Sequence, residues 1–366
     1  MGGARAVIAA PAPRALEDSI RAQAYGLGFD LVGITALGSM ETAPYFDRWL
    51  ERGYAGDMHY LPKWARKRRD SRLPYEGVRS AIVVAMNYGG AEPAGPVARY
   101  ARGDDYHDVL DAKLRELHAW IASELGREIR GRAYVDTGPL LERDLARRAG
   151  LGWFGKNTNL IHPKLGSFFF LGALLLDLEL APDEPFESDH CGTCTRCIDA
   201  CPTQAIVEER VLDATKCISY LTIEAKGEIP LALRESLGEL IYGCDICQDV
   251  CPWNEKFSRT LPEGSPFAAR EFIAAKDART LARDLLAMSQ EEFSRAFKNS
   301  PMKRAKLRGL KRNAAVALGN VGATNDVPAL EAALSHDEPL VREHAASALA
   351  RLSARLDRAS PGPAFP

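Results

Sequence analysis

The chain has 366 residues, and at about 150 residues per domain this length predicts roughly two to three domains. Its 47 Lys and Arg nearly balance 49 Asp and Glu, and 46% of its residues are hydrophobic, a composition that excludes wholesale disorder. The longest apolar stretch, Phe168 to Leu176, is far shorter than the about 20 residues of a membrane helix. Met1 to Pro13 lacks an apolar core, so we expect no secretory signal.

The first 180 residues predict an α/β domain. Short apolar runs indicate strands, and apolar residues three and four apart indicate helices. In chain order we expect a strand at Ala81 to Met86, a helix at Tyr106 to Leu125, a strand end at Tyr134 to Val135, a helix at Leu140 to Ala149 stopped by Gly150, and a strand at Phe168 to Leu176. The Pro- and Asp-rich segment Ala181 to Phe186 is predicted to be a linker.

The eight cysteines all lie between Cys191 and Cys251, a clustering that favours metal binding over a disulfide scaffold. The run Cys191-x-x-Cys194-x-x-Cys197-x-x-x-Cys201-Pro has the spacing that binds a [4Fe–4S] cluster, with the fourth Cys crossing to a second cluster. A second run holds Cys244, Cys247 and Cys251, and Ile241 stands where a further Cys would complete it.

The lone Cys217 can supply the missing thiolate, so the eight cysteines match two clusters. We assign one cluster to Cys191, Cys194, Cys197 and Cys251, and the other to Cys201, Cys217, Cys244 and Cys247. The clusters alone imply electron transfer. Zinc ribbons are the alternative, and the triple spacing and the two Cys-Pro endings argue against them.

After Pro252 the pattern predicts helices without strands. Lys311 to Leu318 resembles Arg342 to Leu349 at an offset of 31 residues, which is typical of paired-helix repeats of the HEAT type. Ser294 to Thr324 holds eight Lys and Arg and no acid, which suits phosphate binding, with a solvated helix face as the alternative. A second basic cluster, Lys63 to Arg72, is either a similar patch or a loop held by salt bridges.

Asp136 follows the predicted strand end and is a candidate general acid, with a turn or N-cap carboxylate as the alternative. The run from Gly150 to Gly155 has the letters of a dinucleotide-binding motif, but it follows a helix rather than a strand. Asn157 stands where a phosphate-binding loop needs Ser or Thr. The loop would suit a flat ligand with polar edges, or it is simply a packed turn.

Together these motifs resemble the epoxyqueuosine reductase family over about Asp18 to Leu352. The similar segments are Tyr100 to His107, Tyr134 to Arg143, Leu151 to Asn157, Gly166 to Gly172, both cysteine runs, Cys217 to Glu224, and Lys311 to Asn320. The resemblance implies reduction of the epoxide of epoxyqueuosine to the alkene of queuosine, at the first anticodon position of tRNA. It also implies cobalamin beside two [4Fe–4S] clusters, although no Asp-x-His-x-x-Gly motif for a histidine on cobalt occurs.

The resemblance also implies site residues and a domain order. Asp136 would protonate the departing oxygen. Residues expected around the corrin are Arg99, Tyr100, Arg143, Lys156, Asn157, Ser167, Tyr220 and Glu224, and those expected on tRNA are Lys303, Arg304, Arg308 and Arg312. We expect an α/β cobalamin-binding domain at 1–180, a ferredoxin-like two-[4Fe–4S] domain at 181–260, HEAT-like tRNA-binding repeats at 261–358 and a disordered tail at 359–366.

We further expect a cytoplasmic monomer that binds the anticodon stem-loop and takes electrons from an external donor, away from membranes. One competing interpretation is a corrinoid reductive dehalogenase, which usually carries a twin-arginine export signal. Here Arg68-Arg69 is internal, with no apolar segment after it. The other is a non-catalytic electron carrier with a HEAT docking module, which would have no use for the segments around Asp136 and Trp153.

Overall fold

The computed structural model describes residues 15–359 of the chain. The leader segment Met1 to Pro13 lies outside the described residues, as does the tail expected at 359–366, apart from Ala359. None of the helices in the described part is long and apolar enough to cross a membrane.

The strands are β1 Leu31–Ala36, β2 Ser80–Asn87, β3 Gly131–Tyr134, β4 Trp153–Phe154, β5 Leu160–Ile161, β6 Phe169–Leu176, β7 Ile206–Glu208 and β8 Val211–Leu212. The helices before the cysteines are α1 Ala15–Gly26, α2 Ala43–Glu51, α3 Tyr60–Lys63, α4 Ala65–Arg68, α5 Tyr106–Glu124 and α6 Glu142–Arg148. Among the cysteines are α7 Arg196–Asp199, α8 Ile218–Ile223, α9 Leu231–Arg234, α10 Ile246–Asp249 and α11 Pro252–Phe257. The last helices are α12 Ala278–Ala287, α13 Gln290–Ala296, α14 Lys306–Val321, α15 Val327–Ala333 and α16 Pro339–Ala359.

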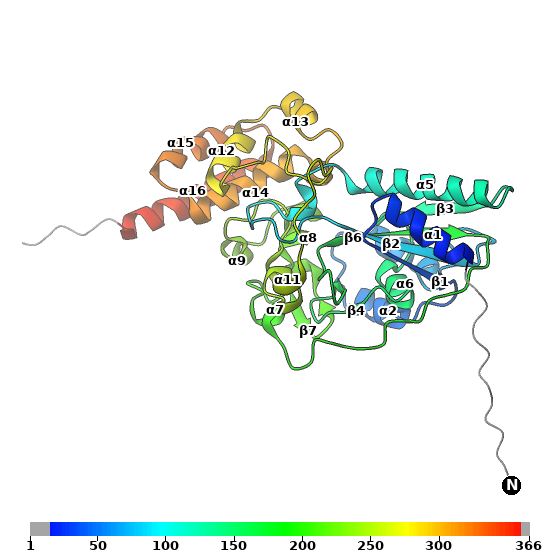
Figure 1. Cartoon of the computed structure of the whole chain (residues 1–366). Coiled ribbons are helices and arrows are strands. Elements are labelled where there is room, and N and C mark those ends of the chain that lie inside the picture. Colours follow the sequence, from blue (N-terminus) through cyan, green and yellow to red (C-terminus); the bar gives the residue numbers. More distant parts are fainter. Residues whose placement is uncertain (1–14, 360–366) are drawn as a thin grey trace, which may run out of the picture.

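A four-stranded sheet in the order β1-β2-β6-β3 organises the N-terminal part, and every neighbouring pair in it is antiparallel. The two central strands are the two predicted from unbroken apolar runs, and both predictions are confirmed. Helices cover both faces of the sheet (Figure 1), α1 and α5 on one side and α2 and α6 on the other. Since both faces are buried, the central strands lack the alternation of a half-exposed strand.

The predicted helices that flank the Asp136 segment are also confirmed. α5 begins after Asp105, whose carboxylate accepts a hydrogen bond from the backbone N–H of His107 and so caps the helix. α6 is followed by Gly150, whose φ of +78° is the left-handed conformation that favours glycine after a helix. These two caps fix where the chain enters and leaves the elements on either side of β3.

The C-terminal helices α12 to α16 form a separate cluster at the far end of the molecule from the sheet (Figure 1). The two halves of the sequence repeat lie in α14 and α16, which pack against each other. Their backbones come close, because a Cβ on Gly319 would lie 2.9 Å from the Cα of Ala348. The cysteine segment contacts this cluster through Tyr242, whose hydroxyl donates to the carbonyl of Pro301 over 2.6 Å.

The basic segment does not form one helix with one charged face. Arg304 lies in a short 3-10 helix, Pro301–Ala305, and the chain then turns at Lys306, whose φ is +61°. Arg308 and Arg312 follow in α14. Arg308 is exposed, but Arg312 is 1% exposed, and its guanidinium donates to three backbone carbonyls, those of Leu221, Ala225 and Gly227. The expected contact of Arg312 with tRNA is therefore wrong, because its donors hold the fold together.

Candidate active site and cluster segment

Asp136 lies just beyond the end of β3, in a turn that presents its side chain outward. Its φ is +55°, a left-handed conformation that Asp tolerates better than most residues and that often marks functional turns. Thr137 N–H donates to the carbonyl of Val135 over 2.5 Å, which tightens the turn. The side chain is 64% exposed, so a substrate can reach the carboxylate.

Two residues from the start of α5 meet this carboxylate. The hydroxyl of Tyr106 donates to Oδ2 of Asp136 over 2.9 Å, and Nε2 of His107 lies 3.4 Å from the same oxygen. The other ring nitrogen of His107, Nδ1, lies 2.6 Å from Oδ1 of Asp105. The imidazole therefore sits between two carboxylates, one that orients it and one that faces the open site. Sequence reasoning missed Tyr106 and His107, although both stand in the segment Tyr100 to His107 that carries part of the family resemblance.

The pKa values in this group favour a proton on the histidine. Desolvation alone would lower the pKa of His107, but its hydrogen bond with Asp105 and the negative charges of Asp105 and Asp136 raise it to about 9. Although 64% of the Asp136 side chain is accessible, surrounding protein reduces its hydration, which by itself would raise its pKa. The positive charge of His107 at 3.4 Å and the hydrogen bond from Tyr106 outweigh this effect and lower the pKa of Asp136. At neutral pH the pair is an imidazolium beside a carboxylate.

A second carboxyl group supports the turn from the start of α6. Oε1 of Glu142 accepts a hydrogen bond from the backbone N–H of Asp136 over 2.7 Å. Desolvation and the negative charge of Asp136 raise the pKa of Glu142 to about 8.

Arg68 lies beside the same turn, is 6% exposed, and donates to the carbonyl of Gly138 over 3.4 Å. Its Nη1 has no hydrogen-bond partner among the described residues. That buried donor is available to an acceptor such as water or a bound cofactor.

The eight cysteines are free thiols, seven of them half-buried and Cys251 buried. Burial, together with the neighbouring thiols of Cys191, Cys251 and Cys194, raises the pKa of Cys197 to about 11. Burial likewise raises the pKa of Cys244, to about 12, with Cys217 and Cys201 among its charged neighbours. For Cys197 and Cys244 these neighbours belong to the same predicted set of four, whereas the pKa of Cys247 is raised by Cys197 of the other set as well as by Cys244, Cys217 and Cys201 of its own.

No three His, Cys, Asp or Glu side chains in the described residues are placed to hold a single metal ion. A [4Fe–4S] cube does not require that convergence, because its four thiolates bind at separate irons. The sulfur of Cys201 accepts a hydrogen bond from the backbone N–H of Ala205 over 3.2 Å, a contact of the kind that tunes cluster potential.

An aromatic group joins the cysteine segment to the α/β part. Trp153, 3% exposed, packs with Phe186, His190 and Trp253, and belongs to the same apolar cluster as Cys191 and Cys251. The glycine-rich loop before Lys156 is thus a packed turn that supports the cysteines.

Three of the residues expected around a corrin are tied into the same junction. Arg99 is buried, with Nη1 3.0 Å from Oδ2 of Asp245 and 2.8 Å from Oδ1 of Asp249. The hydroxyl of Ser167 accepts from Nδ2 of Asn254 over 2.9 Å. Tyr100 packs its ring near Tyr242. Arg99 and Ser167 hold the second cysteine run against the sheet, so the structure gives their polar groups a structural role rather than a free one.

The other five expected residues lie on three segments, namely α6, the loop after β4, and the region of α8. Asn157 donates from Nδ2 to the carbonyl of Cys247 over 3.1 Å, Lys156 pairs with Glu209 over 2.6 Å, and Arg143 donates to the carbonyl of Thr158. On α8, the hydroxyl of Tyr220 accepts from the backbone N–H of Asp57 over 2.7 Å. Glu224, the residue that follows α8, pairs with Arg304 over 2.8 Å. Arg304 also lies over the ring of Tyr60, 5.5 Å from its centroid, so the C-terminal end of α8 lies near the start of α3.

Comparison with known proteins covers nearly the whole chain. A family described as "4Fe-4S double cluster binding domain" matches residues 190–254, and one described as "Epoxyqueuosine reductase QueG, DUF1730" matches residues 68–137. An epoxyqueuosine reductase from Xanthomonas campestris is 42% identical over 358 residues, covering 94% of this chain and 99% of that protein. One from Leadbetterella byssophila is 46% identical, covering 81% of this chain and 96% of that protein.

Solved structures agree with these matches. A crystal structure of epoxyqueuosine reductase with an epoxyqueuosine-modified tyrosine tRNA stem loop has a TM-score of 0.79 and 30% identity, covering 94% of this chain and 93% of that one. The same values apply to a structure of epoxyqueuosine reductase from Bacillus subtilis with a catalytic aspartate loop swung out of the active site.

Proposed function

The chain belongs to the epoxyqueuosine reductase family, and from that premise we propose that it reduces the epoxide of epoxyqueuosine in tRNA to the alkene of queuosine. The observation that carries the proposal is the exposed Asp136 carboxylate, bonded to Tyr106 and beside the charged His107. This arrangement delivers a proton to an oxygen atom at the surface of the site.

The balance of the reaction sets what the site must supply. Converting an epoxide to an alkene and water consumes two electrons and two protons, breaks both carbon–oxygen bonds and releases the oxygen as water. An alkoxide is a poor leaving group, so protonation of the oxygen is the step in which a positioned acid helps most. The described residues near Asp136 hold two suitable protons, one on His107 and one on Glu142, at neutral pH.

We assign the acid function to Asp136 and His107 as a pair. Because the pKa of Asp136 is lowered, its carboxylate is ionised at rest and the proton resides on His107. The proton passes from Nε2 of His107 to Oδ2 of Asp136 and then to the substrate oxygen. Asp105 keeps the imidazole oriented through Nδ1, and Tyr106 fixes the carboxylate in the turn. This refines the prediction of Asp136 as the acid by adding the residue that recharges it.

The thiols fit two [4Fe–4S] clusters, grouped as the spacing predicts. Cys191, Cys194, Cys197 and Cys251 would hold one, and Cys201, Cys217, Cys244 and Cys247 the other. The mutual influence of the thiols within each set supports this grouping. So does the match of a double-cluster family over residues 190–254. The clusters would pass single electrons from an external donor to the site.

We also propose cobalamin as the cofactor between the clusters and Asp136; when bound and reduced, it would supply the two electrons to the epoxide carbon. The buried, unpartnered Nη1 of Arg68 fits a cofactor rich in amide carbonyls, because such a group offers acceptors. Of the predicted residues, those that would contact cobalamin are Arg143, Asn157, Tyr220 and Glu224. Lys156 and Tyr100 would position these contacts. Arg99 and Ser167 would act only through the loops that they brace.

The domain layout remains as predicted in our proposal: an α/β domain to residue 180, a cluster domain at 181–260 and HEAT-like repeats at 261–358. The pairing of α14 with α16 supports the repeat assignment. The repeats would bind the anticodon stem through Lys303, Arg304 and Arg308. A tRNA-modifying enzyme of this kind would work in the cytoplasm, and we propose that it does so as a monomer.

The test is conversion of the substrate itself. The protein, reconstituted anaerobically with iron, sulfide and cobalamin and supplied with a chemical reductant, is incubated with tRNA that carries epoxyqueuosine. Nucleosides from digested tRNA are then separated and weighed by mass spectrometry. We expect loss of one oxygen from the modified nucleoside, with reaction dependent on cobalamin. A fully loaded protein that leaves the nucleoside unchanged would contradict the proposed function.

A further inference from the structure

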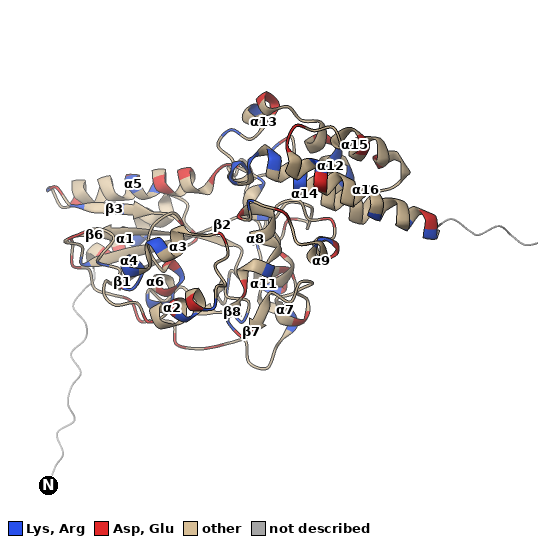
Figure 2. Cartoon of the chain, turned by 180° about the vertical axis from the view of Figure 1, so that it is seen from behind, with Lys and Arg blue, Asp and Glu red and all other residues tan. Residues whose placement is uncertain are grey.

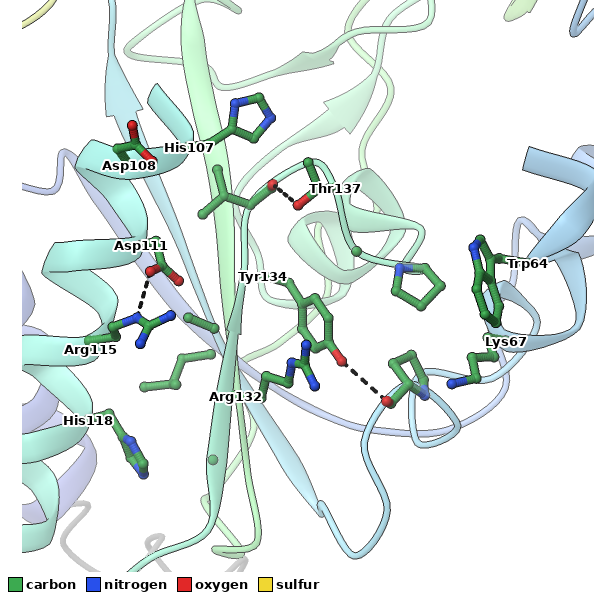
Figure 3. Close-up of a pocket in the computed structure, with 17 residues that line it drawn as sticks. Trp64, Lys67, His107, Asp108, Asp111, Arg115, His118, Arg132, Tyr134 and Thr137 are labelled. Carbon is green, nitrogen blue, oxygen red and sulfur yellow. Dashed lines mark hydrogen bonds and ion pairs between the residues drawn. The ribbon is translucent and has the colours of Figure 1, made fainter. Parts of the chain in front are cut away.

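A cavity of about 700 Å³ lies along the free edge of β3, next to the Asp136 turn (Figure 3). β3 is the last strand of its sheet and pairs only with β6, so its other edge is open to the cavity. Thr137 and Pro139 of the turn line one end, and His107 also reaches it. The cavity is therefore separated from the Asp136 carboxylate by only the width of one turn.

An exposed aromatic side chain forms one wall of this cavity. Trp64, between α3 and α4, is 42% exposed, an unusual amount of apolar surface for a tryptophan. The ammonium groups of Lys63 and Lys67 lie 5.3 and 5.4 Å from its ring centroid. In the described residues neither lysine forms an ion pair, so two unneutralised cations lie beside the flat ring (Figure 3 shows Lys67 and Trp64 together).

The strand side of the cavity adds a third free cation. The guanidinium of Arg132 on β3 stacks 5.4 Å from the ring of Tyr134, and no acid in the described residues pairs with it. On the α5 side, by contrast, Arg115 is neutralised by Asp111 at 2.6 Å, and Asp108 adds a negative charge. An anionic ligand would thus lie on the Trp64 side, between Lys67 and Arg132.

The segment of α3 and α4 also contacts the basic C-terminal region, through Tyr60 and Arg304. Tyr60, one helical turn before Trp64, is 40% exposed and lies under the guanidinium of Arg304, 5.5 Å from its ring centroid. Tyr60 and Trp64 thus present two exposed rings four residues apart, and Lys63 and Lys67 are spaced equally. Blue segments on α3 and α4 mark this stretch in Figure 2. Aromatic faces alternating with cations are how proteins hold single-stranded nucleic acid.

We infer that the cavity between Trp64 and β3 binds a nucleotide of the anticodon loop adjacent to the target nucleotide, with its base on Trp64 and its phosphate between Lys67 and Arg132. The inference rests on the proposed function, because it takes the substrate strand to pass the Asp136 turn. In this inference α3 and α4 recognise the unpaired loop of the tRNA, and the C-terminal helices contact the stem separately.

The first test measures RNA affinity with two probes: the anticodon stem-loop, and the same stem closed by a stable tetraloop. Stacking of one base on an aromatic ring is worth about 1–3 kcal/mol, which corresponds to roughly a 5- to 150-fold change in affinity. We expect Trp64→Ala to weaken binding of the anticodon stem-loop by at least about fivefold and to leave the tetraloop stem unchanged. Trp64→Phe should restore most of the affinity. Tyr25→Ala, which removes a 51% exposed ring on α1, is the matched control and should have no effect.

The second test addresses the cations. Lys67→Ala combined with Arg132→Ala should reduce the slope of log affinity against log salt by about 0.7 per lost phosphate contact on a single strand. The double variant Lys256→Ala with Arg358→Ala removes the same charge from exposed positions on α11 and at the end of α16. That control should leave the slope unchanged. Iron content checks that every variant is folded.

Turnover separates this inference from the proposed function. With converted tRNA as readout, Trp64→Ala should raise KM and leave kcat at saturating tRNA close to that of the unaltered protein. An unaltered protein that binds the stem-loop but never converts it would refute the function and leave the affinity comparison valid. Affinity and salt slope equal to the controls in both variants would overturn the subsite. The open edge of β3 would then be free for a strand of a protein partner.

Discussion

The carboxylate of Asp136 is the residue on which the chemistry depends. Asp136→Asn keeps the size of the side chain and can still accept the hydrogen bond of Tyr106, but it cannot carry a proton to the substrate. General acid catalysis is typically worth about 10²–10⁴-fold, so we expect turnover to fall by that range. Cobalamin binding, followed by its absorption spectrum, should survive. Normal turnover would return Asp136 to the role of a turn residue.

The protonated side chains of His107 and Glu142 beside Asp136 predict how turnover depends on pH. His107 and Glu142 have pKa values raised to about 9 and about 8, so both are protonated at neutral pH and lose their protons as the pH rises. Turnover at saturating substrate should therefore be constant near pH 7 and fall above about pH 8 to 9. His107→Asn should lower the rate on the plateau and remove the limb assigned to His107. A rate that stays flat to pH 10 in the unaltered protein would contradict the relay.

The sequence identifies Asp136 but not its partners, and distance along the chain explains the difference. Asp136 stands directly after a recognisable strand, where a polar residue is conspicuous. Tyr106 and His107 come 30 and 29 residues earlier, at the start of a helix whose apolar spacing says only that it is buried. Their approach to Asp136 depends on α5 packing alongside β3, which no local pattern encodes. Asp105 before Tyr106 is the one usable signal, because it is a helix N-cap.

At the scale of elements, the two central strands were predictable along their length, whereas of the two edge strands only the end of β3 was predicted and β1 was not. β2 and β6 are continuous apolar runs. β1 is Leu-Val-Gly-Ile-Thr-Ala, and its Gly33 dilutes the pattern. A Cβ there would lie 2.1 Å from the carbonyl oxygen of Ala149. Tertiary packing therefore requires the glycine, although glycine is a poor strand former. The same limit applies to the basic segment, where charge alone predicts an exposed face for Arg312 and the structure buries it.

Two arginines on α14, one buried and one exposed, allow the structural role of Arg312 to be measured. Arg312→Ala leaves three backbone carbonyls without their donor and a space where the guanidinium was. An unsatisfied buried polar group costs about 1–3 kcal/mol, so we expect the free energy of unfolding to fall by at least about 3 kcal/mol. Arg308→Ala, one turn earlier on the same helix and exposed, should change it by less than about 0.5 kcal/mol. Thermal unfolding of the two variants makes the comparison, and equal stabilities would refute the structural role.

For the whole molecule, the first expectation concerns iron. After anaerobic reconstitution we expect about eight irons per chain, four for each cluster. Cys201→Ala combined with Cys217→Ala removes two thiols of one set and should leave about four. Cys191→Ala with Cys194→Ala is the matched pair from the other set and should also leave about four. Stoichiometric zinc in the unaltered protein, or two irons in place of four in either variant, would show that the assignment is wrong.

The proposed contact between the C-terminal helices and the tRNA stem depends on basic side chains that are not already paired. Lys303, Lys306 and Arg308 form no ion pair among the described residues, whereas Arg304 is bound to Glu224 and Arg312 is buried. The first three therefore have charges free for phosphates, whereas Arg304 would have to leave Glu224 to contact one. Neutralised phosphates release counterions, so each contact to a duplex contributes about 0.9 to the slope of log affinity against log salt.

Replacing Lys303, Lys306 and Arg308 together by Ala should therefore weaken tRNA binding and lower that slope by up to about 2.7, three contacts at about 0.9 each. The tetraloop stem should be affected as strongly as the anticodon stem-loop, because a duplex contact does not depend on the loop. Iron content and cobalamin binding should be unchanged, since in the described residues none of the three side chains forms a hydrogen bond or an ion pair with the cysteine segment, and Lys306 and Arg308 are exposed. Affinity is measured across a salt titration, with Arg127→Ala, Lys256→Ala and Arg358→Ala combined as the control. A slope equal to that of the control would mean that these side chains only face solvent, and the stem would then have to be held along α3 and α4.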